Sequence, residues 1–538
     1  YMGTFSQSRT VSNFKNSNNI YTDADIPKLS KSRFQMGLQC SKALYYACYH
    51  PDLADAPSEL MTATQKNGDM VGRLAHDMFP GGVLIDEDYY DRNNAMAHTQ
   101  QAMSENAPAI FEATFMHNNV LVKNDILQNN GDGTYDLIEV KSATSLKNQN
   151  ITDVAVQLNV LEGAGIKVRN AYLMRLNPKY VYNGGEHDLD QLFVKDDITD
   201  IAKKYARVEV KHDLKRMHNV LRNHGREPKC DIGKQCTTPF QCSFYRQCHE
   251  NLPEHPITEL PRLSDKLMTR LQKDNIMAIK DIPEGYGLSE AQEKVRQVVL
   301  SNDVKVDPSV KKEFRSLNYP LHFLDFETMQ TVVPEYKGTR PYQQIPFQWS
   351  DHIMNEPDAE VSHEEFLHQK PGKDPRKYFV ESLLKTVEKD EGHIVVYSDF
   401  EKSRLQELAR DYPQYDTRIA KVIDRLYNLE KTVRTSVSHP DFKGKTSIKY
   451  VLPAVVKEND YKGLSIGNGG VAMTRYRQAI NGEIPQEEAS QVYKDLLVYC
   501  GVDTMSMVKV FNALKDIKTV KKDYKDKQKE KLVDEPPF

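Results

Sequence analysis

The sequence predicts a mixed α/β protein, because short apolar strands alternate with amphipathic helices in two separate parts of the chain. The chain has 538 residues. At roughly 100 to 200 residues per domain, that length corresponds to about three units. Hydrophobic residues make up 39% of the chain and charged residues 28%, a balance typical of packed cores under a well-solvated surface. We therefore expect two α/β domains joined by a third segment.

The first α/β domain is predicted at 26–252. Its order of elements, with paired strands between helices, indicates a meander closed by a Gly-rich hairpin. The expected elements, in chain order, are helices at 30–49 and 70–79, strands at 111–119 and 120–128, a turn at 129–135, a strand at 136–143, a helix at 153–165 and a strand at 168–177.

The rest of the chain divides at a proline-rich boundary. Charged helical sequence with three prolines near its start predicts a helical connector, and a second α/β domain follows it. The predicted segments are the connector at 253–318, the second domain at 319–517 with strands at 319–329 and 393–400 and a helix at 489–517, and a charged, solvated tail at 518–538.

Charge and hydropathy exclude two classes of protein. Lys and Arg total 72 against 76 Asp and Glu, so a globally basic nucleic-acid coat is excluded, and any polyanion must be held by local grooves. The N-terminal segment is polar, and no apolar run approaches the roughly 20 residues that span a bilayer. We therefore expect a cytoplasmic protein without a membrane partner.

The stretch YDLIEVKSAT places Glu139 and Lys141 on one face of a strand, because residues two apart point the same way. Asp125 ends the preceding strand, and the hairpin would bring it beside Glu139. Two adjacent carboxylates are costly without a cation, so the pattern predicts Mg²⁺ or Mn²⁺, with Lys141, its pKa lowered by the metal, orienting or deprotonating water. The competing interpretation is a structural ion pair on the sheet.

A second acidic pattern lies in the C-terminal domain. Asp325 and Glu327 are two apart on an apolar strand, and Tyr499 and Asp503 are four apart on one helix face. Glu401 follows the strand that lies between them in the chain. Carboxylates from separate elements predict a two-metal phosphoryl-transfer site.

Four of the seven cysteines lie in one segment, spaced C-x5-C-x5-C-x5-C at Cys230, Cys236, Cys242 and Cys248. In a reducing compartment such clustering favours a metal site over disulfides. Zinc sites usually contain C-x2-C pairs, and their absence here favours an iron–sulfur cluster. A structural zinc site remains the alternative.

The N-terminal pattern D-x13-E-x-K resembles the signature of PD-(D/E)XK nucleases, and the flanking residues resemble their RecB-like branch. That branch has a histidine in a G-x3-H context before the motif and a glutamine-bearing helix after it, which here correspond to His76 and Gln157. The resemblance implies a restriction-endonuclease-like fold with His76 as a metal ligand or phosphate contact. Leu161 stands where the branch usually has tyrosine, so the DNA contact of this helix stays open.

The cysteines resemble those of iron–sulfur RecB-like nucleases of the AddB type and of CRISPR-associated exonucleases. These proteins take one cysteine before the nuclease core and three after it. The resemblance implies that a 4Fe-4S cluster is held by Cys40, Cys236, Cys242 and Cys248. Replacement of Cys40 by Cys230 stays open.

The C-terminal pattern resembles the DEDD exonucleases of the RNase H-like, DnaQ-type superfamily. The resemblance implies Tyr499 as the residue that orients water, and as metal ligands Asp325, Glu327, Glu401 and Asp503. The second motif of that superfamily usually ends in Phe-Asp, whereas this chain has Phe400-Glu401, which leaves Asp399 as a rival ligand. As a whole, the chain resembles an uncharacterised bacterial two-nuclease family over about 26–517.

The sequence therefore predicts a metal-dependent DNA nuclease with two phosphodiesterase centres, an exonuclease on single-stranded or end-bearing DNA. Lys147 and Arg340 are expected in DNA-binding grooves, and protein partners in DNA processing, repair or defence are compatible with it. The alternatives are a DNA-binding or assembly module in which one or both centres are inactive, and an RNase.

Overall fold

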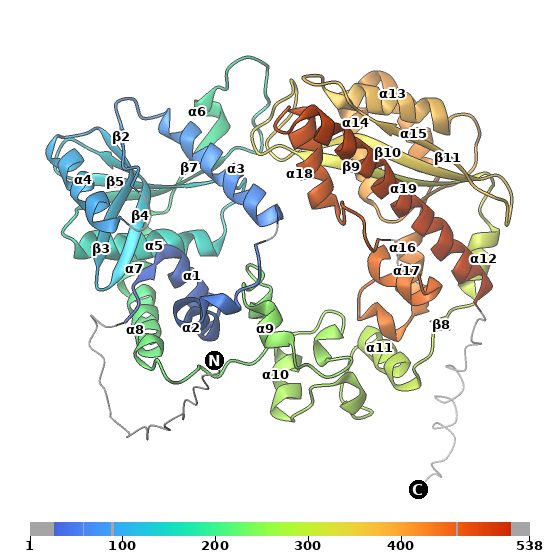
Figure 1. Cartoon of the computed structure of the whole chain (residues 1–538), viewed down its shortest axis with the longest axis horizontal. Helices are drawn as coiled ribbons and strands as arrows, with labels where there is room; N and C mark the ends of the chain where they lie inside the picture. The colour runs from blue at the N-terminus through green and yellow to red at the C-terminus, as the bar shows by residue number, and fades with distance from the viewer. Residues whose placement is uncertain (1–25, 58, 88–90, 459–460, 518–538) are drawn as a thin grey trace, which may run out of the picture.

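The computed structural model describes residues 26–57, 59–87, 91–458 and 461–517. They form a mixed α/β protein with an N-terminal and a C-terminal lobe, each built around its own sheet (Figure 1). A helical connector, green in Figure 1, joins the lobes. The tail predicted at 518–538 lies outside the described residues. Within the described ranges, every helix is too short or too polar to cross a bilayer.

The N-terminal lobe contains a seven-stranded sheet in the order β2-β3-β4-β5-β6-β7, with β1 paired to β4. Its strands are β1 (Leu29–Ser30), β2 (Val83–Leu84), β3 (Ala109–His117), β4 (Val120–Asn129), β5 (Tyr135–Lys141), β6 (Val168–Leu176) and β7 (Phe193–Asp197). Its helices are α1 (Lys31–Gln39), α2 (Ser41–Tyr49), α3 (Glu59–His76), α4 (Arg92–Ser104), α5 (Asn148–Gly163), α6 (Leu189–Leu192), α7 (Thr199–Arg207), α8 (Glu209–Arg222) and α9 (Tyr245–His249).

The predicted meander is confirmed, because β3, β4 and β5 pair antiparallel with Ile126 opposite Ile138. Gly131 and Gly133 in the hairpin have φ of 78° and 80°, a region that glycine occupies without strain. The single helix predicted at 30–49 is instead two helices. Extended backbone at Cys40, with φ of −160°, separates α1 from α2.

The connector begins with its own small core, formed by residues such as Ile257, Leu271 and Ile282. Its elements are α10 (Asp265–Lys273), α11 (Glu290–Ser301), β8 (Lys305–Val306) and α12 (Ser309–Arg315). From β8 onward the chain already packs with the C-terminal lobe, because β8 pairs with β14 (Val437–Ser438) and Phe314 lies in that lobe's core.

The C-terminal lobe contains a five-stranded sheet in the order β11-β10-β9-β12-β13. Its strands are β9 (Leu321–Gln330), β10 (Gln344–Met354), β11 (Ser362–Leu367), β12 (Ile394–Val396) and β13 (Leu426–Asn428). Its helices are α13 (Pro375–Val387), α14 (Phe400–Asp411), α15 (Asp416–Asp424), α16 (Leu429–Ser436), α17 (Ile448–Val456), α18 (Gly469–Ile480) and α19 (Gln486–Asp516). The long helix predicted at 489–517 is confirmed as part of α19.

The two lobes also meet away from the connector, where α3 contacts α18 (Figure 1). In the loop that follows β9, the amide of Gly338 donates to the carbonyl of Tyr182 over 2.7 Å, and the Tyr182 amide donates to Thr339 over 3.0 Å. The hydroxyl of Tyr342 donates to the carbonyl of Ser142, the residue directly after Lys141. The strand that carries Asp325 and Glu327 is thus tied through its following loop to the end of β5.

Candidate functional site

The N-terminal centre forms where β4 and β5 run side by side under the start of α1. The Oδ2 atom of Asp125 accepts from the amide of Val140 over 2.7 Å, which fixes that carboxylate at the level of Glu139. The ammonium of Lys31 lies 2.9 Å from Oε1 of Glu139 and 3.8 Å from Oδ1 of Asp125. The two carboxylates therefore converge, and a lysine from α1 lies next to both.

A second ammonium and a third carboxylate complete this centre. Lys141 Nζ lies 2.5 Å from Oε1 of Glu139 and 2.5 Å from Oδ2 of Asp153. The amide of Gln157 donates to Oε2 of Glu139 over 2.7 Å and accepts from Asn124 over 2.7 Å. Helix α5 thus supplies Asp153 and Gln157 from one face, because residues four apart lie together on a helix.

The pKa values at this centre follow from burial set against the ion pairs. Burial alone would raise the pKa of Glu139, but the ammonium groups of Lys141 and Lys31 outweigh it and lower that pKa. Burial and the charge of Glu139 raise the pKa of Asp125 to about 7. Burial would lower the pKa of Lys141, but Glu139 and Asp153 raise it, opposite to the direction expected beside a bound cation.

His76 ends α3 and stacks on Phe111, with ring centres 4.0 Å apart and planes 8° apart. Within the described ranges it does not join Asp125 and Glu139 in a group of three ligand atoms closer than 4.8 Å. The neighbour of Phe111, Glu112, has φ of 57° in the middle of β3, where the pairing with β4 passes over Glu112 and the opposite residue, Asp125, without a change of register. Such backbone strain in a non-glycine residue is typical of functional sites.

Sequence reasoning placed Asp125, Glu139, Lys141 and Gln157 in one site, and the structure brings these four together. It missed Lys31 and Asp153. It also missed Glu112, whose pKa is raised mainly by burial and also responds to the charges of Lys123, Lys31 and Glu139. Lys31 had a local signal: it is the first residue of a helix, where the positive end of the helix dipole disfavours an ammonium. Nothing in the local sequence marks Glu112, whose direction depends on the irregular pairing of β3.

The C-terminal centre joins β9 to α19. Carboxylate oxygens of Asp325, Glu327 and Asp503 all lie within 4.8 Å of one another, the only such group of three or more potential metal ligands among the residues described. Asp325 and Glu327 project from the same face of β9, as their spacing predicts. Asp503 comes from the middle of α19, more than 170 residues later in the chain.

Glu401 adds a fourth carboxylate from the first turn of α14. It is 3% exposed and lies close enough to Asp325 for each carboxyl to affect the pKa of the other. Its Oε2 atom is buried and has no hydrogen-bond partner among the described residues. Asp399 instead is exposed and accepts from the side-chain amide of Asn428 over 3.1 Å. The geometry therefore favours Glu401 over Asp399 as the fourth acid.

Burial dominates the electrostatics of this centre. Burial and the neighbouring charges of Asp503 and Glu401 raise the pKa of Asp325 well above its usual range. Burial raises the pKa of Glu401 to about 8. Within the described chain, no lysine or arginine nitrogen lies within 4.0 Å of the four carboxylates. This crowding without a paired cation is the donor set expected of a site for a hard divalent ion.

Two tyrosines and one lysine border the four acids. The hydroxyl of Tyr461 donates to Oδ1 of Asp503 over 2.5 Å, and Tyr499 is buried one helical turn before Asp503. Burial and the charge of Asp503 raise the pKa of both tyrosines, which remain neutral hydrogen-bond donors. The Nζ of Lys449 lies 5.2 Å from the centre of the Tyr461 ring and 5.5 Å from that of Tyr499. Tyr461 and Lys449 were missed because they come from a part of the sequence without a catalytic pattern.

Five cysteines surround a small cavity of about 20 Å³ between α2 and the segment before α9. They are Cys40, Cys230, Cys236, Cys242 and Cys248. The Sγ atoms of Cys40 and Cys230 are 3.5 Å apart. The cavity is therefore lined both by Cys40, which is distant in sequence, and by Cys230, which is not among the four ligands that the resemblance implies. A set of thiols around one small space suits zinc or an iron–sulfur cluster.

The two residues expected in DNA-binding grooves lie near the two centres in sequence. Lys147 is exposed and is the N-cap residue of α5, and Arg340 is exposed in the loop that ties the lobes together. Within the described part of the chain, neither side chain has a carboxylate within 4.0 Å.

Comparison with known proteins gives partial matches. The family described as "Domain of unknown function (DUF2779)" matches 322–447, a segment that carries Asp325, Glu327 and Glu401. Uncharacterized protein UU173 of Ureaplasma parvum serovar 3 is 26% identical over 232 residues, 39% of this chain and 33% of that protein. Uncharacterized protein MG366 of Mycoplasma genitalium is 25% identical over 310 residues, 49% of this chain and 44% of that protein. The chain thus spans less than half the length of each of these two relatives.

Proposed function

We propose that this protein is a metal-dependent nuclease that hydrolyses phosphodiester bonds in DNA, with the C-terminal centre as its main catalytic site. The observation that carries the proposal is the group of Asp325, Glu327 and Asp503, with ligand oxygens within 4.8 Å of one another and Glu401 beside them. The buried Oε2 atom of Glu401, which has no hydrogen-bond partner among the described residues, further supports the proposal, because a bound ion would give this atom a partner.

At the C-terminal centre, Mg²⁺ or Mn²⁺ held by the four acids would neutralise charge on the phosphate and activate water. The chain's own groups supply the rest of the chemistry. The rigid faces of β9 and α19 fix the direction of the acids. Tyr461 donates its one hydroxyl hydrogen to Asp503 and so holds that carboxylate, whereas neutral Tyr499 can donate to an oxygen of the substrate or of the attacking water. Lys449 adds positive charge on the same side.

At the N-terminal centre, the donors Asp125 and Glu139 also suit a divalent ion, but two ammonium groups already balance much of their charge. Lys141 bridges Glu139 and Asp153, so it is held where it can orient a water molecule or a phosphate oxygen. This arrangement supports a second centre. A metal ion could bind there only if Lys31 moved away from Asp125 and Glu139 or shared these carboxylates with the ion.

The cysteine pocket supports a structural role. Cys40 lies between α1 and α2, and the other four cysteines follow α8, so a thiolate-bound metal or cluster would tie the two ends of the N-terminal lobe together. Purified under anaerobic conditions, a protein with a cluster would be brown, with absorbance near roughly 400 nm. A colourless protein with one equivalent of zinc would identify the alternative.

The proposal is tested by incubating DNA of one sequence, labelled at the 5′ or the 3′ end, with protein and Mn²⁺. We expect cleavage by the intact chain, and a loss of more than about 1000-fold when Asp325→Asn is combined with Lys141→Met. The two single variants assign the products to each centre, and RNA of the same sequence tests the sugar preference.

Binding of DNA without cleavage by the intact chain in Mg²⁺ or Mn²⁺ would contradict the proposal and favour a binding or assembly module. Faster cleavage of the RNA would assign the protein to the RNases instead.

A further inference from the structure

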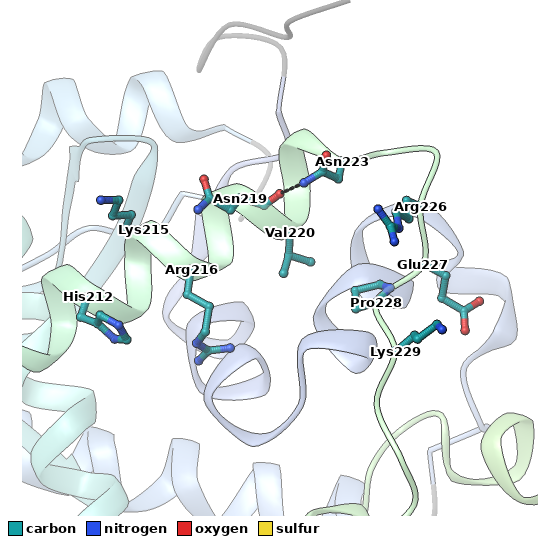
Figure 2. Close-up of a pocket in the computed structure, with 10 residues that line it drawn as sticks. All are labelled: His212, Lys215, Arg216, Asn219, Val220, Asn223, Arg226, Glu227, Pro228 and Lys229. Carbon is teal, nitrogen blue, oxygen red and sulfur yellow. Dashed lines mark hydrogen bonds between the residues drawn. The ribbon is translucent and has the colours of Figure 1, made fainter. Parts of the chain in front are cut away.

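Two surface pockets of the described structure lie along helix α8, and neither is lined by an acid of the two centres. One of about 720 Å³ lies between α8 and the loop after it, with His212, Lys215 and Arg216 on the helix and Arg226 and Lys229 on the loop (Figure 2). The other, of about 1030 Å³, lies on the neighbouring face of the helix, where Lys211, His218 and Arg222 line it. Lys215 lines both pockets, so they form one continuous surface across α8. We call it the α8 surface.

The α8 surface is strongly basic in a chain whose formal net charge is −4. The residues that line the two pockets include seven lysines and arginines and two glutamates. One of the glutamates, Glu227, is already paired with Lys42 over 2.7 Å. Lys211, Lys215 and Lys229 are exposed and, among the residues described, have no carboxylate within 4.0 Å. The excess positive charge is thus available to a polyanion.

Other lining groups fit a phosphate backbone. Asparagines and histidines, including Asn219, Asn223 and His212, add neutral or weakly basic donors beside the ammonium groups. The lining residues of both pockets, all within the described chain, include no Phe, Tyr or Trp. Grooves that bind single strands usually stack bases on such rings, whereas contacts to the backbone of a duplex need charge and hydrogen-bond donors alone.

The α8 surface lies behind the N-terminal centre. Gln157 of α5 is fully buried and binds Glu139, while Asn159, two residues later on the same helix, lines the pocket beside α8. Lys31 likewise faces Glu139, and Lys28 lines that pocket. A polyanion on this surface would therefore lie against the far side of α5, the helix that supplies Asp153 and Gln157 to the centre.

We propose that the α8 surface binds the phosphate backbone of duplex DNA without reading its sequence, outside both acidic centres. This inference rests on the proposed function for the choice of DNA as the polyanion. The substrate would then be DNA with a double-stranded segment. That segment would bind α8 while one end or one strand of the DNA reaches an acidic centre.

The test is the double variant Lys211→Glu/Lys215→Glu, compared with Lys266→Glu/Lys273→Glu on connector helix α10, whose two lysines are also exposed. Binding of a fluorescent 30-base-pair duplex is measured by anisotropy in EDTA, so that cleavage does not interfere. We expect the α8 variant to bind the duplex about 10-fold more weakly, or weaker still. The slope of the logarithm of the binding constant against the logarithm of the salt concentration should become shallower by about two, as expected for the loss of two phosphate contacts. The α10 variant should bind like the intact protein, and Lys211→Arg/Lys215→Arg should retain binding.

Circular dichroism melting of each variant checks the fold. A duplex affinity in the α8 variant equal to that in the α10 variant would overturn the inference, as would a lack of duplex binding by the intact protein. A larger loss for the single strand of the same sequence would also overturn it. The binding assay contains no metal, so it is independent of cleavage. If the intact protein binds the duplex through α8 but does not cleave DNA in Mn²⁺, the proposed nuclease function is wrong and this inference stands. If the protein cleaves DNA but the α8 variant binds the duplex as well as the intact protein does, this inference is wrong and the proposed function stands.

Discussion

At the N-terminal centre, three carboxylates share two ammonium groups, whereas at the C-terminal centre four carboxylates crowd together with no such partner among the described residues. Both arrangements rest on two charged residues on one face of a strand, Glu139 with Lys141 on β5 and Asp325 with Glu327 on β9. The first resolves its charge with Lys31 and Lys141, and the second resolves it by raising the pKa of its carboxyls. The difference teaches that two charged residues on one strand face can form an ion-pair network or join a group of carboxylates with raised pKa values, depending on what packs above the strand.

The contrast depends on Glu401 being the fourth acid of the C-terminal centre, which gives the largest expected effect. Glu401→Gln keeps the size of the side chain but removes a charge beside Asp325. We expect it to lower cleavage by the C-terminal centre about 100-fold or more, about 2.7 kcal/mol in the activation free energy. The measurement is single-turnover cleavage in a Lys141→Met background, which silences the other centre.

The matched control is Asp399→Asn, because Asp399 is exposed and pairs with Asn428. We expect this variant to change the rate by less than about 3-fold. Equal losses in the two variants would mean that Asp399 turns inward on binding and that the centre has a different fourth acid.

A second prediction concerns the binding of Mn²⁺ to each centre. An ion at about 100 times its Kd stabilises the folded protein by about 2.7 kcal/mol. Because no lysine or arginine of the described residues forms an ion pair with the C-terminal acids, we expect Asp325→Asn to remove most of the Mn²⁺-dependent rise in the melting temperature. Asp125→Asn should remove little of it. The melting temperatures are measured by differential scanning fluorimetry. If Asp125→Asn removed more of the Mn²⁺-dependent rise than Asp325→Asn, the N-terminal centre would be the stronger Mn²⁺ site.

A third prediction concerns pH in the absence of metal. Burial raises the pKa of Glu401 from 4.5 to about 8, so between these values the folded protein holds a proton that the unfolded chain has released. Stability from this group is therefore present at low pH and is lost as pH rises toward 8. In EDTA we expect the free energy of unfolding to fall by on the order of 2 kcal/mol between pH 5 and 8, and Glu401→Gln to lessen that fall.

The same pH series separates the two centres. The N-terminal centre contains shifts in both directions, with the pKa of Asp125 raised to about 7 and that of Glu139 lowered, so its contributions oppose each other. Added Mn²⁺ should restore stability more at pH 8 than at pH 6, because the carboxylates bind metal only when deprotonated. Stability that rises between pH 5 and 8 in EDTA would contradict the assignment of the shifted groups.

The smallest predicted effect tests whether Lys31 takes the place of a metal ion at the N-terminal centre. Lys31→Gln removes the ammonium that lies next to both Asp125 and Glu139. In an Asp325→Asn/Glu327→Gln background, we expect Mn²⁺ to bind the N-terminal centre about 10-fold more tightly, about 1.4 kcal/mol, by calorimetry. Lys28→Gln, three residues earlier and away from the centre, should leave the affinity unchanged, and weaker binding in Lys31→Gln would show that the lysine assists the metal.

The sequence by itself determined which residues could share a face. Strand alternation placed Glu139 with Lys141 and Asp325 with Glu327, and helical spacing placed Tyr499 near Asp503, because these relations depend only on the geometry of one element. The glycine-bearing hairpin set the level of Asp125 opposite Glu139 for the same reason. These local rules were enough for the α/β class and for the core of both centres.

Only the tertiary structure decided whether a lysine pairs with the acids of each centre. Lys31 reaches Glu139 across 108 residues, and the five cysteines meet because α2 packs beside the segment that follows α8. The choice between Asp399 and Glu401 depends on how α14 begins against β9, and no local pattern separates them. The physical reason is that the energy of a buried charge depends on everything packed around it, whereas the direction of a side chain along a strand depends on the backbone alone.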